Sequence, residues 1–270
     1  MDARLQRRVQ RYGWDKAAPC YEQSWEAHLE PAHDALLELA DLRPGDRVLD
    51  VACGTGLVTR RAAALVAPDG QVVGTDISEQ MIAAARRADT RTDGTVRFAR
   101  MDAEALEFAD GSFEAALCAL GLMYVVDPGK AVGELHRLLR AGGRAAAAVW
   151  GQRSQCGWAE IFPIVDARVQ SDVCPMFFHL GTGQSLHHAF AAAGFGDIVT
   201  RRLQTRLQYA NGDEACEAVF AGGPVGLAYS RFSDTMKVEA HKEYLASLKP
   251  YRQGEGYSVP GEFVIVAGKK

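Results

Sequence analysis

Arg47-Val48-Leu49-Asp50-Val51-Ala52-Cys53-Gly54-Thr55-Gly56-Leu57 is the stretch of sequence that decides the fold of this chain. Its mostly apolar run from Val48 to Val51 predicts a short, buried parallel strand. The alanine-rich run 57–67 predicts a helix, which Pro68-Asp69-Gly70 should end. A tight turn between strand and helix presents free backbone N–H groups and a positive helix end to an anionic ligand group. Gly54 and Gly56 lack Cβ atoms, so a ligand can approach the backbone closely.

Three carboxylates are expected at or near the carboxyl ends of three successive strands. The first is Asp50. Asp76 ends the strand predicted over 71–76, and Asp102 follows the strand predicted over 95–100. Ligands of open α/β sheets bind at this edge. Asp76 comes about twenty residues after the glycines, where nucleotide-binding α/β units place the carboxylate that accepts hydrogen bonds from ribose hydroxyls. The pattern predicts a nucleotide-like ligand.

These residues resemble the class I S-adenosylmethionine-dependent methyltransferases. The segment Asp50 to Gly56 is similar to motif I of that family, in the form found in the ubiquinone/menaquinone-biosynthesis C-methyltransferases and many small-molecule methyltransferases. Asp76-Ile77-Ser78 and Met101-Asp102-Ala103 resemble the second and third cofactor positions. The resemblance covers roughly residues 43–150, and Ala52 stands where the family often has glycine. It implies S-adenosyl-L-methionine as the cofactor, S-adenosyl-L-homocysteine as the product and a small-molecule acceptor as the substrate.

The resemblance also implies which residues hold the cofactor. Asp76 is expected to bind the ribose and Asp102 the exocyclic amine of adenine, while Ile77 and Ala103 flank the adenine ring. The N-terminal aromatic residues either cover the edge of the sheet or, for Tyr21 or Trp25, close over the cofactor or substrate. The expected cofactor-binding residues are Tyr21, Trp25, Asp50, Ala52, Cys53, Gly54, Thr55, Gly56, Asp76, Ile77, Met81, Asp102, Ala103, Glu104, Ala119 and Leu120.

The expected architecture is one domain over residues 1–270 with a Rossmann-like, doubly wound α/β fold. As in the resembled family, the sheet should have seven mostly parallel strands, an antiparallel last strand and a helical lid. The core should comprise about 41–151, 185–209 and 257–270, and the lid 1–40, 152–184 and 210–256. Hydrophobic periodicity and turn signals predict strands over 115–120, 144–150, 198–209 and 262–267, and helices over 129–140, 157–169, 185–193, 213–221 and 233–248, with Ser78 and Ser185 as N-caps.

Methyl transfer from a sulfonium needs mainly alignment and exclusion of water, because the donor carries its own positive leaving group. An acceptor that must lose a proton benefits from a base, and histidine titrates near neutral pH. His179, in the apolar loop 174–181, and Tyr124, just after the fourth strand, are the candidate catalytic residues. A structural role for His179 remains an alternative, and an amine acceptor would need no base.

The composition is that of a globular protein without a metal site or a disulfide framework. The 270 residues are 48% hydrophobic and 24% charged, and the net charge of −4 disfavours nucleic-acid and anionic-membrane binding. The six cysteines are scattered singly, with no Cys-x-x-Cys pair. No secretory signal or membrane-length apolar run is visible, so we expect a cytoplasmic protein without membrane insertion. It would be a monomer or a homodimer.

Two other functions remain as alternatives. An NAD-dependent oxidoreductase would need the pattern G-x-G-x-x-G, but Thr59 occupies the third glycine position, and Asp50 and Asp102 have no standard role there. A non-catalytic protein that binds S-adenosylmethionine or another nucleotide would keep the same fold without turnover. Accumulation of a demethylated donor in the presence of an acceptor would distinguish an enzyme from this second alternative.

Overall fold

One mixed β-sheet forms the centre of the computed structural model, which describes residues 3–169 and 176–270. The strands are arranged in the order β3-β2-β1-β4-β5-β8-β6, and a two-residue strand, β7, pairs with the start of β8. The first five are parallel, whereas β8 runs antiparallel to both neighbours. The predicted fold class is confirmed, with β7 as an additional strand. The strands are β1 Arg47–Val51, β2 Gln71–Asp76, β3 Val96–Arg100, β4 Phe113–Ala119, β5 Leu139–Trp150, β6 Gly196–Tyr209, β7 Arg252–Gln253 and β8 Gly256–Lys269.

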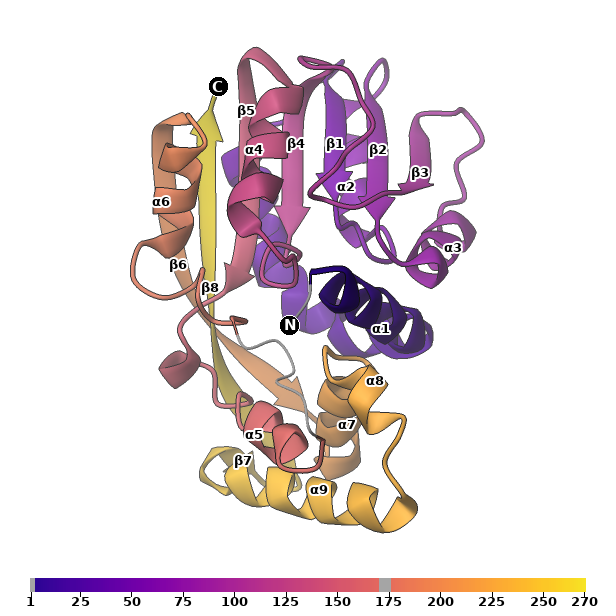
Figure 1. Ribbon diagram of the computed structural model, residues 1–270, viewed down its shortest axis with the longest axis vertical. Helices are drawn as coiled ribbons and strands as arrows, with labels where there is room; N and C mark the ends of the chain where they lie inside the picture. Colours follow the sequence, from indigo (N-terminus) through magenta and orange to yellow (C-terminus); the bar gives the residue numbers. More distant parts are fainter. Residues whose placement is uncertain (1–2, 170–175) are drawn as a thin grey trace.

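Helices cover both faces of the sheet. In Figure 1, α4 and α6 lie on one face, and α2 and the C-terminal part of α1 lie on the other. This double cover explains why the central strands β1 and β4 are almost entirely buried. The helices are α1 Ala3–Ala40, α2 Leu57–Val66, α3 Glu79–Ala88, α4 Pro128–Leu138, α5 Ile161–Asp166, α6 Ser185–Ala192, α7 Gly212–Cys216, α8 Gly226–Tyr229 and α9 Asp234–Ser247, with short 3-10 helices at Arg153–Gln155 and Lys249–Tyr251 and a π-helical turn at Glu217–Ala221.

Residues 3–40 form one long helix. Helix α1 continues through Pro19 and Pro31 for 38 residues. Its C-terminal part packs behind the sheet, where Leu36 is fully buried. Its N-terminal part crosses below the arrowheads of β1, β2 and β4 (Figure 1). The helix therefore closes the carboxyl edge of the sheet, which is the edge where ligands of this fold class bind.

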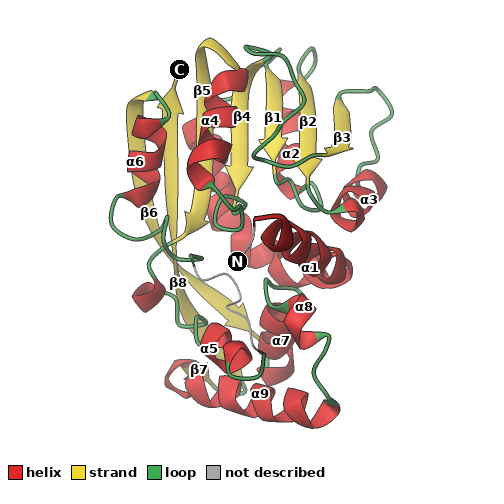
Figure 2. Cartoon of the chain, in the orientation of Figure 1, coloured by secondary structure: helices red, strands yellow, loops and turns green. Residues whose placement is uncertain are grey.

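Strands β6 and β8 form an antiparallel hairpin that extends beyond the rest of the sheet. They pair from Gly196↔Lys269 to Tyr209↔Tyr257, whereas β5 pairs with β8 only as far as Trp150↔Phe263. Residues 210–255 lie between these two strands, and their helices α7, α8 and α9 gather near α5 at the overhanging end (Figure 2). The overhanging end of the hairpin is thus covered by helices from residues 161–166 and from the insert 210–255.

Several predicted element bounds need correction. β8 begins at Gly256 instead of Glu262, because pairing with β6 holds Pro260 and Gly261 in the strand although they look like a turn in the sequence. α5 is shorter than the predicted 157–169, since residues 157–160 form turns. Ser185 is the first residue of α6 and does not cap it, whereas Ser78 caps α3 as predicted. Of the apolar loop 174–181, Cys174 and Pro175 lie outside the described residues.

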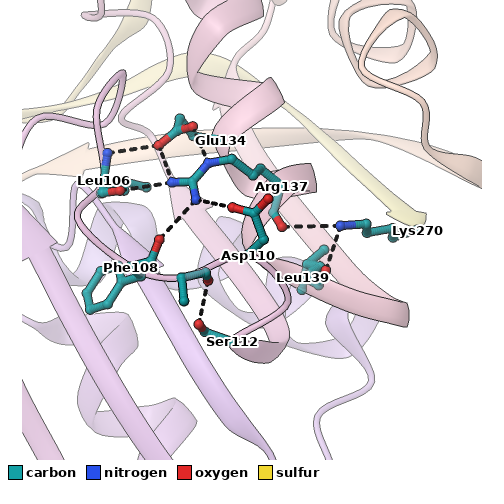
Figure 3. Close-up of polar contacts among 9 residues, drawn as sticks. Leu106, Phe108, Asp110, Ser112, Glu134, Arg137, Leu139 and Lys270 are labelled. Atoms are coloured by element: carbon teal, nitrogen blue, oxygen red, sulfur yellow. Dashed lines mark hydrogen bonds and ion pairs between the residues drawn. The ribbon is translucent and has the colours of Figure 1, made fainter.

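Arg137, near the end of α4, holds the loop between β3 and β4 in place (Figure 3). Its guanidinium pairs with Glu134 through Nε–Oε1 and Nη2–Oε2 distances of 2.7 and 2.8 Å. It also donates to the carbonyl oxygens of Leu106 and Phe108, both at 2.9 Å, and to the Asp110 carboxylate. These two carbonyls belong to the segment that continues from Asp102 to Glu104. Arg137 therefore fixes a loop that borders the carboxyl edge of the sheet.

Replacement of this arginine should destabilise the fold. We expect Arg137→Ala to lower the free energy of unfolding by about 1–2 kcal/mol, because two carbonyls and two carboxylates lose their donor, although partial exposure lets water replace some of these bonds. Urea denaturation measures the change. Arg140→Ala is the matched control: its guanidinium is half exposed and pairs with Glu114 at 3.2 Å, so the expected change is within about 0.5 kcal/mol. Equal losses in the two variants would contradict the assigned role.

Candidate functional site

A pocket lies at the carboxyl ends of β1, β2, β3 and β4, under the N-terminal part of α1. It is where the three expected carboxylates were predicted to gather, and two of them, Asp76 and Asp102, line it. Of the residues expected to bind a cofactor, all line the pocket except Asp50, Cys53, Thr55 and Gly56. The lining residues are Arg7, Gln10, Trp14, Tyr21, Trp25, Leu29, Ala52, Gly54, Asp76, Ile77, Met81, Met101, Asp102, Ala103, Glu104, Ala119, Leu120, Gly121, Tyr124, Val125, Val126, Trp150, Trp158, Gly223 and Pro224.

The turn between β1 and α2 forms one wall of the pocket. Ala52, Gly54 and Gly56 all have positive φ angles, of 55°, 55° and 82°, which fold the chain back tightly before α2 begins. Gly56 must be small, because a Cβ atom there would lie 3.0 Å from Cζ of Phe98. Ala52 and Gly54 face the pocket, whereas Gly56 packs under it. The turn therefore exposes its backbone to the pocket at Ala52 and Gly54, while Gly56 packs closely against Phe98.

Asp76, the last residue of β2, is pinned at the pocket by backbone donors from two elements. Its Oδ2 accepts a hydrogen bond from Gly54 N at 2.9 Å, and its Oδ1 accepts one from Ser78 N at 2.8 Å. Burial raises its pKa to about 6, and these two backbone bonds oppose the rise. Each carboxylate oxygen keeps a further lone pair for a ligand. A diol such as that of a ribose fits this carboxylate.

Asp50 has a different environment from the one expected. It is fully buried and does not line the pocket. Its Oδ2 accepts a hydrogen bond from the Thr59 hydroxyl at 2.5 Å, in the first turn of α2. Desolvation by burial raises its pKa to about 7, and the nearby Asp76 adds to the rise, while the hydroxyl of Thr59 opposes it. Asp50 therefore anchors the start of α2 behind the turn rather than touching a ligand in the pocket.

Cys53, Thr55 and Gly56 are likewise turned away from the pocket. Cys53 packs in a small apolar cluster with Ile82, Ala85 and Phe98, and Thr55 is 2% exposed. The tight turn alternates inward and outward residues, so that only Ala52 and Gly54 of this segment face the pocket. The sequence placed these residues near a ligand but could not give the direction of each side chain.

Helix α1 closes the end of the pocket formed by β3. Arg7 pairs with Asp102 at 2.8 Å and with Glu104 at 2.5 Å. Glu104, 2% exposed, also accepts a hydrogen bond from Val126 N at 2.8 Å. Ile77, Met81 and Ala103 supply apolar lining beside these carboxylates. A flat base with an amine edge fits here, between apolar side chains and within reach of Asp102.

The end of β4 supplies the next wall. Leu120 has a φ of 61°, and a Cβ atom on Gly121 would collide with that of Ala52, so the chain must pass very close to the glycine turn. The Tyr124 ring lines the pocket and packs edge-on against Trp14, with centroids 4.8 Å apart, and against Phe177, at 5.4 Å. Of the two candidate catalytic residues, Tyr124 lies at the pocket.

His179 does not lie there. Its side chain is exposed, and it is not among the residues that line the pocket. The apolar neighbours Phe177 and Phe178 suggested a buried loop, but Phe177 turns inward onto Tyr124 while His179 faces solvent. No histidine of the described segments 3–169 and 176–270 lines the pocket. The expected role of His179 as a base is therefore not supported by its position.

Sequence reasoning missed about half of the pocket. Trp150 and Trp158 come from the end of β5 and the following turn, and Gly223 and Pro224 come from the insert between β6 and β8. Arg7 and Trp14 come from the start of α1. For the three tryptophans the only signal in the sequence was aromatic character, which core residues share; Arg7, Gly223 and Pro224 carried no signal. These residues meet at the pocket only because segments far apart in the chain pack together, so no local sequence pattern identifies them.

The charged side chains that line the pocket within the described residues are mostly carboxylates. Within residues 3–169 and 176–270, no group of His, Cys, Asp and Glu side chains could hold a metal. Asp76, Asp102 and Glu104 outnumber the single lining cation, Arg7, which favours a positively charged ligand. In the same described segments, no helix is long and apolar enough to cross a bilayer.

Comparison with known proteins finds a methyltransferase domain in the part of the chain that contains the glycine turn. Residues 48–143 match the family described as Methyltransferase domain. The ubiquinone/menaquinone biosynthesis C-methyltransferase UbiE of Teredinibacter turnerae is 43% identical over 110 residues, which make up 40% of this chain and 44% of that protein. The chain thus matches less than half of the length of this relative.

Solved structures share the fold over most of the chain. The YcgJ protein from Bacillus subtilis has a TM-score of 0.60 at 19% identity, covering 89% of this chain and 98% of its own. Phosphoethanolamine N-methyltransferase 2 from Haemonchus contortus, solved with phosphomonomethylethanolamine and S-adenosylhomocysteine, has a TM-score of 0.61 at 19% identity, covering 95% and 57%. At these identities the likeness is one of fold.

The matched region contains the glycine turn and the carboxylates Asp76, Asp102 and Glu104 that border the pocket. Residues 48–143 match the methyltransferase-domain family and resemble the class I S-adenosylmethionine-dependent methyltransferases, with similarity to the ubiquinone/menaquinone-biosynthesis C-methyltransferases over 40% of the chain.

Proposed function

We propose that this protein transfers the methyl group of S-adenosylmethionine to a small-molecule acceptor. The observation that carries the proposal is the position of Asp76. Hydrogen bonds from Gly54 N and Ser78 N hold its carboxylate beside the glycine turn. This carboxylate would accept hydrogen bonds from both ribose hydroxyls. Asp102 would accept one from the adenine amine, and Ile77 and Ala103 would flank the ring.

The charge of the pocket fits a sulfonium donor. Three carboxylates line it against one guanidinium, so a positively charged donor is favoured over its neutral product. When bound, S-adenosylmethionine supplies a methyl group whose C–S bond breaks as the acceptor atom forms its new bond, and the electron pair of the broken bond stays on sulfur. The chain contributes alignment through Asp76 and Asp102, and its aromatic walls exclude water.

No protein base is assigned to the reaction. Tyr124 is the candidate nearest to the expected methyl path, because it follows β4 and lines the pocket beside Trp14. We propose that its phenol positions the acceptor. The proton of an acceptor O–H or ring C–H would pass to water or buffer after the methyl group has moved.

An NAD-dependent oxidoreductase and a non-catalytic donor-binding protein are the two alternative functions, and different observations disfavour each. In a dinucleotide-binding oxidoreductase, position 59 would be a small residue for close packing. Here Thr59 is buried and its hydroxyl is bound to Asp50, which disfavours that function. A donor-binding protein without turnover would bind S-adenosylhomocysteine and leave every acceptor unchanged. Incubation with S-adenosylmethionine and 1-naphthol, catechol, histamine or phosphoethanolamine, with detection of S-adenosylhomocysteine by mass spectrometry, tests the proposal.

Donor binding should weaken as the pH falls through about 6. Ribose hydroxyls donate to the ionised Asp76, whose pKa in the free protein is raised to about 6, so protonation competes with binding. We expect the Kd of S-adenosylhomocysteine to rise about tenfold from pH 7 to pH 5. Asp76→Asn should bind about tenfold or more weakly at pH 7 and lose this pH dependence.

Isothermal titration calorimetry measures these affinities. Asp93→Asn is the matched control, since this exposed carboxylate lies outside the pocket and accepts a hydrogen bond from Thr95 N in its own turn. It should keep both the wild-type affinity and the wild-type pH dependence. A flat pH profile in the wild type, or an Asp76→Asn variant with full affinity, would refute the ribose assignment.

Tyr124→Phe should slow methyl transfer without weakening donor binding. If the phenol positions the acceptor, the loss of its hydroxyl should reduce kcat by about tenfold or more, while the Kd of S-adenosylhomocysteine stays constant. His179→Ala should keep wild-type rates, because this side chain is exposed and away from the pocket. Rates from the acceptor panel above provide the measurement. The reverse pattern, a slow His179→Ala and a normal Tyr124→Phe, would contradict the assignment.

A further inference from the structure

Charge is distributed unevenly along helix α1. Residues 4–16 contain four arginines, one lysine and a single acid, whereas residues 17–40 contain five acids and neither lysine nor arginine. Acids in the first turn and bases in the last turn stabilise a helix through its dipole. Helix α1 has neither. Its charge distribution opposes the dipole, so the stability of the helix does not account for the cations at its start.

Most of these cations are not used by the fold. Arg7 pairs with two carboxylates that line the pocket. By contrast, no ion pair and no side-chain hydrogen bond joins Arg8, Arg11 or Lys16 to another residue in the described part of the chain. Three positive charges are therefore available to a partner outside this chain.

Two large apolar side chains lie exposed among these cations. Leu5 is 39% exposed and Tyr12 is 46% exposed. The positions 5, 8, 12 and 16 follow one another at spacings of three or four residues, so they share one side of the helix. Arg11 borders this side, and its guanidinium lies 4.6 Å from the centroid of the Tyr12 ring. We call Leu5, Arg8, Arg11, Tyr12 and Lys16 the basic face.

The basic face is distinct from the surface that α1 turns toward the pocket. Arg7, Gln10 and Trp14 line the pocket, and within residues 3–16 only Gly13 is buried. This part of α1 crosses below the arrowheads of β1, β2 and β4 (Figure 1). The basic face is therefore an uncovered helix surface beside the carboxyl edge of the sheet, and contact with it would leave the pocket lining in place.

We propose that the basic face docks on the surface of an anionic lipid bilayer. Cations beside such a surface are attracted to its acidic headgroups, and Leu5 and Tyr12 would enter the headgroup layer between them. A nucleic acid backbone would engage the cations but would not bury Leu5. The inference does not rest on the proposed function, because it concerns a surface outside the pocket.

The net charge of the chain, −4, favoured the opposite expectation. At physiological ionic strength, however, exposed charges more than about 10 Å away are largely screened. The cations of the basic face are adjacent on one helix, so the local charge and not the sum over the chain determines the attraction. The docking proposed here is peripheral and needs no segment that enters the hydrocarbon core.

Co-sedimentation with lipid vesicles tests the inference. The vesicles contain phosphatidylcholine alone or phosphatidylcholine with about one-third phosphatidylglycerol, at low and at high salt. We expect wild-type protein to bind the anionic vesicles about tenfold or more tightly than the neutral ones, and high salt to remove this preference. Arg8→Gln/Lys16→Gln should bind the anionic vesicles about tenfold or more weakly, because each cation at the surface contributes about fivefold.

Lys242→Gln/Lys249→Gln is the matched control. It removes the same charge from exposed positions in and just after α9, so it should bind anionic vesicles like the wild type. Because all four substituted side chains are exposed, both double variants should keep the wild-type thermal transition and the wild-type affinity for S-adenosylhomocysteine. An equal loss of vesicle binding in the two double variants would overturn the inference, since binding would then follow net charge alone.

Leu5→Gln/Tyr12→Gln separates a bilayer from other anionic partners. This variant keeps every cation, so it should bind heparin like the wild type, whereas its binding to anionic vesicles should fall about fivefold or more. Unchanged vesicle binding in this variant would overturn the inference. Tighter binding of the wild type to duplex DNA than to anionic vesicles at equal phosphate concentration would assign the face to nucleic acid instead. None of these measurements contains a methyl donor, so the proposed function is tested separately.

Discussion

A hydrogen bond between two neighbouring strand ends organises this protein. The N–H of Gly54, in the turn after β1, donates to the carboxylate of Asp76 at the end of β2. The bond forms only if the turn has the positive φ angles that it shows, and it fixes a buried carboxylate beside open backbone. The chain after β4 also packs against this turn. Residue 121 must be glycine there, because a Cβ atom would collide with Cβ of Ala52.

Helix α1 turns this edge into an enclosed pocket. Arg7 binds the two carboxylates that follow β3, and Asp15 accepts a hydrogen bond from the Ser78 hydroxyl at 2.6 Å, next to Asp76. One helix is thus joined to the ends of two strands by opposite charges and a hydroxyl. Arg7 therefore holds the start of the helix against Asp102 and Glu104, the two carboxylates that follow β3.

The side of the pocket formed by Trp150 and Trp158 is attached to the hairpin that extends beyond the sheet, because Trp150 pairs with Phe263 and Gly157 N donates to the Pro260 carbonyl. Glu262 of β8, 4% exposed, accepts hydrogen bonds from Arg202 of β6 and from the backbone of Gln152, and Arg202 also donates to the Gly181 carbonyl. This half-buried ion pair ties the backbone at Gln152 and Gly181 to β6 and β8. The carboxylates Asp76, Asp102 and Glu104 therefore reach the pocket from a different part of the chain than Trp150 and Trp158 do.

The sequence alone determined the parallel strands, the glycine turn and the meeting of Asp76 and Asp102 at one edge, because these follow from local patterns and from the geometry of parallel strands. It did not determine side-chain directions. Asp50 and Asp76 carry similar signals, yet the pleat of β1 turns Asp50 toward Thr59 and away from the pocket, and His179 faces solvent although its neighbours are apolar. The tertiary structure decided the pairing of Arg7 with Asp102 and the assembly of Trp25, Trp150 and Trp158. These contacts join residues far apart in the chain, and the packing that brings them together has no local pattern in the sequence.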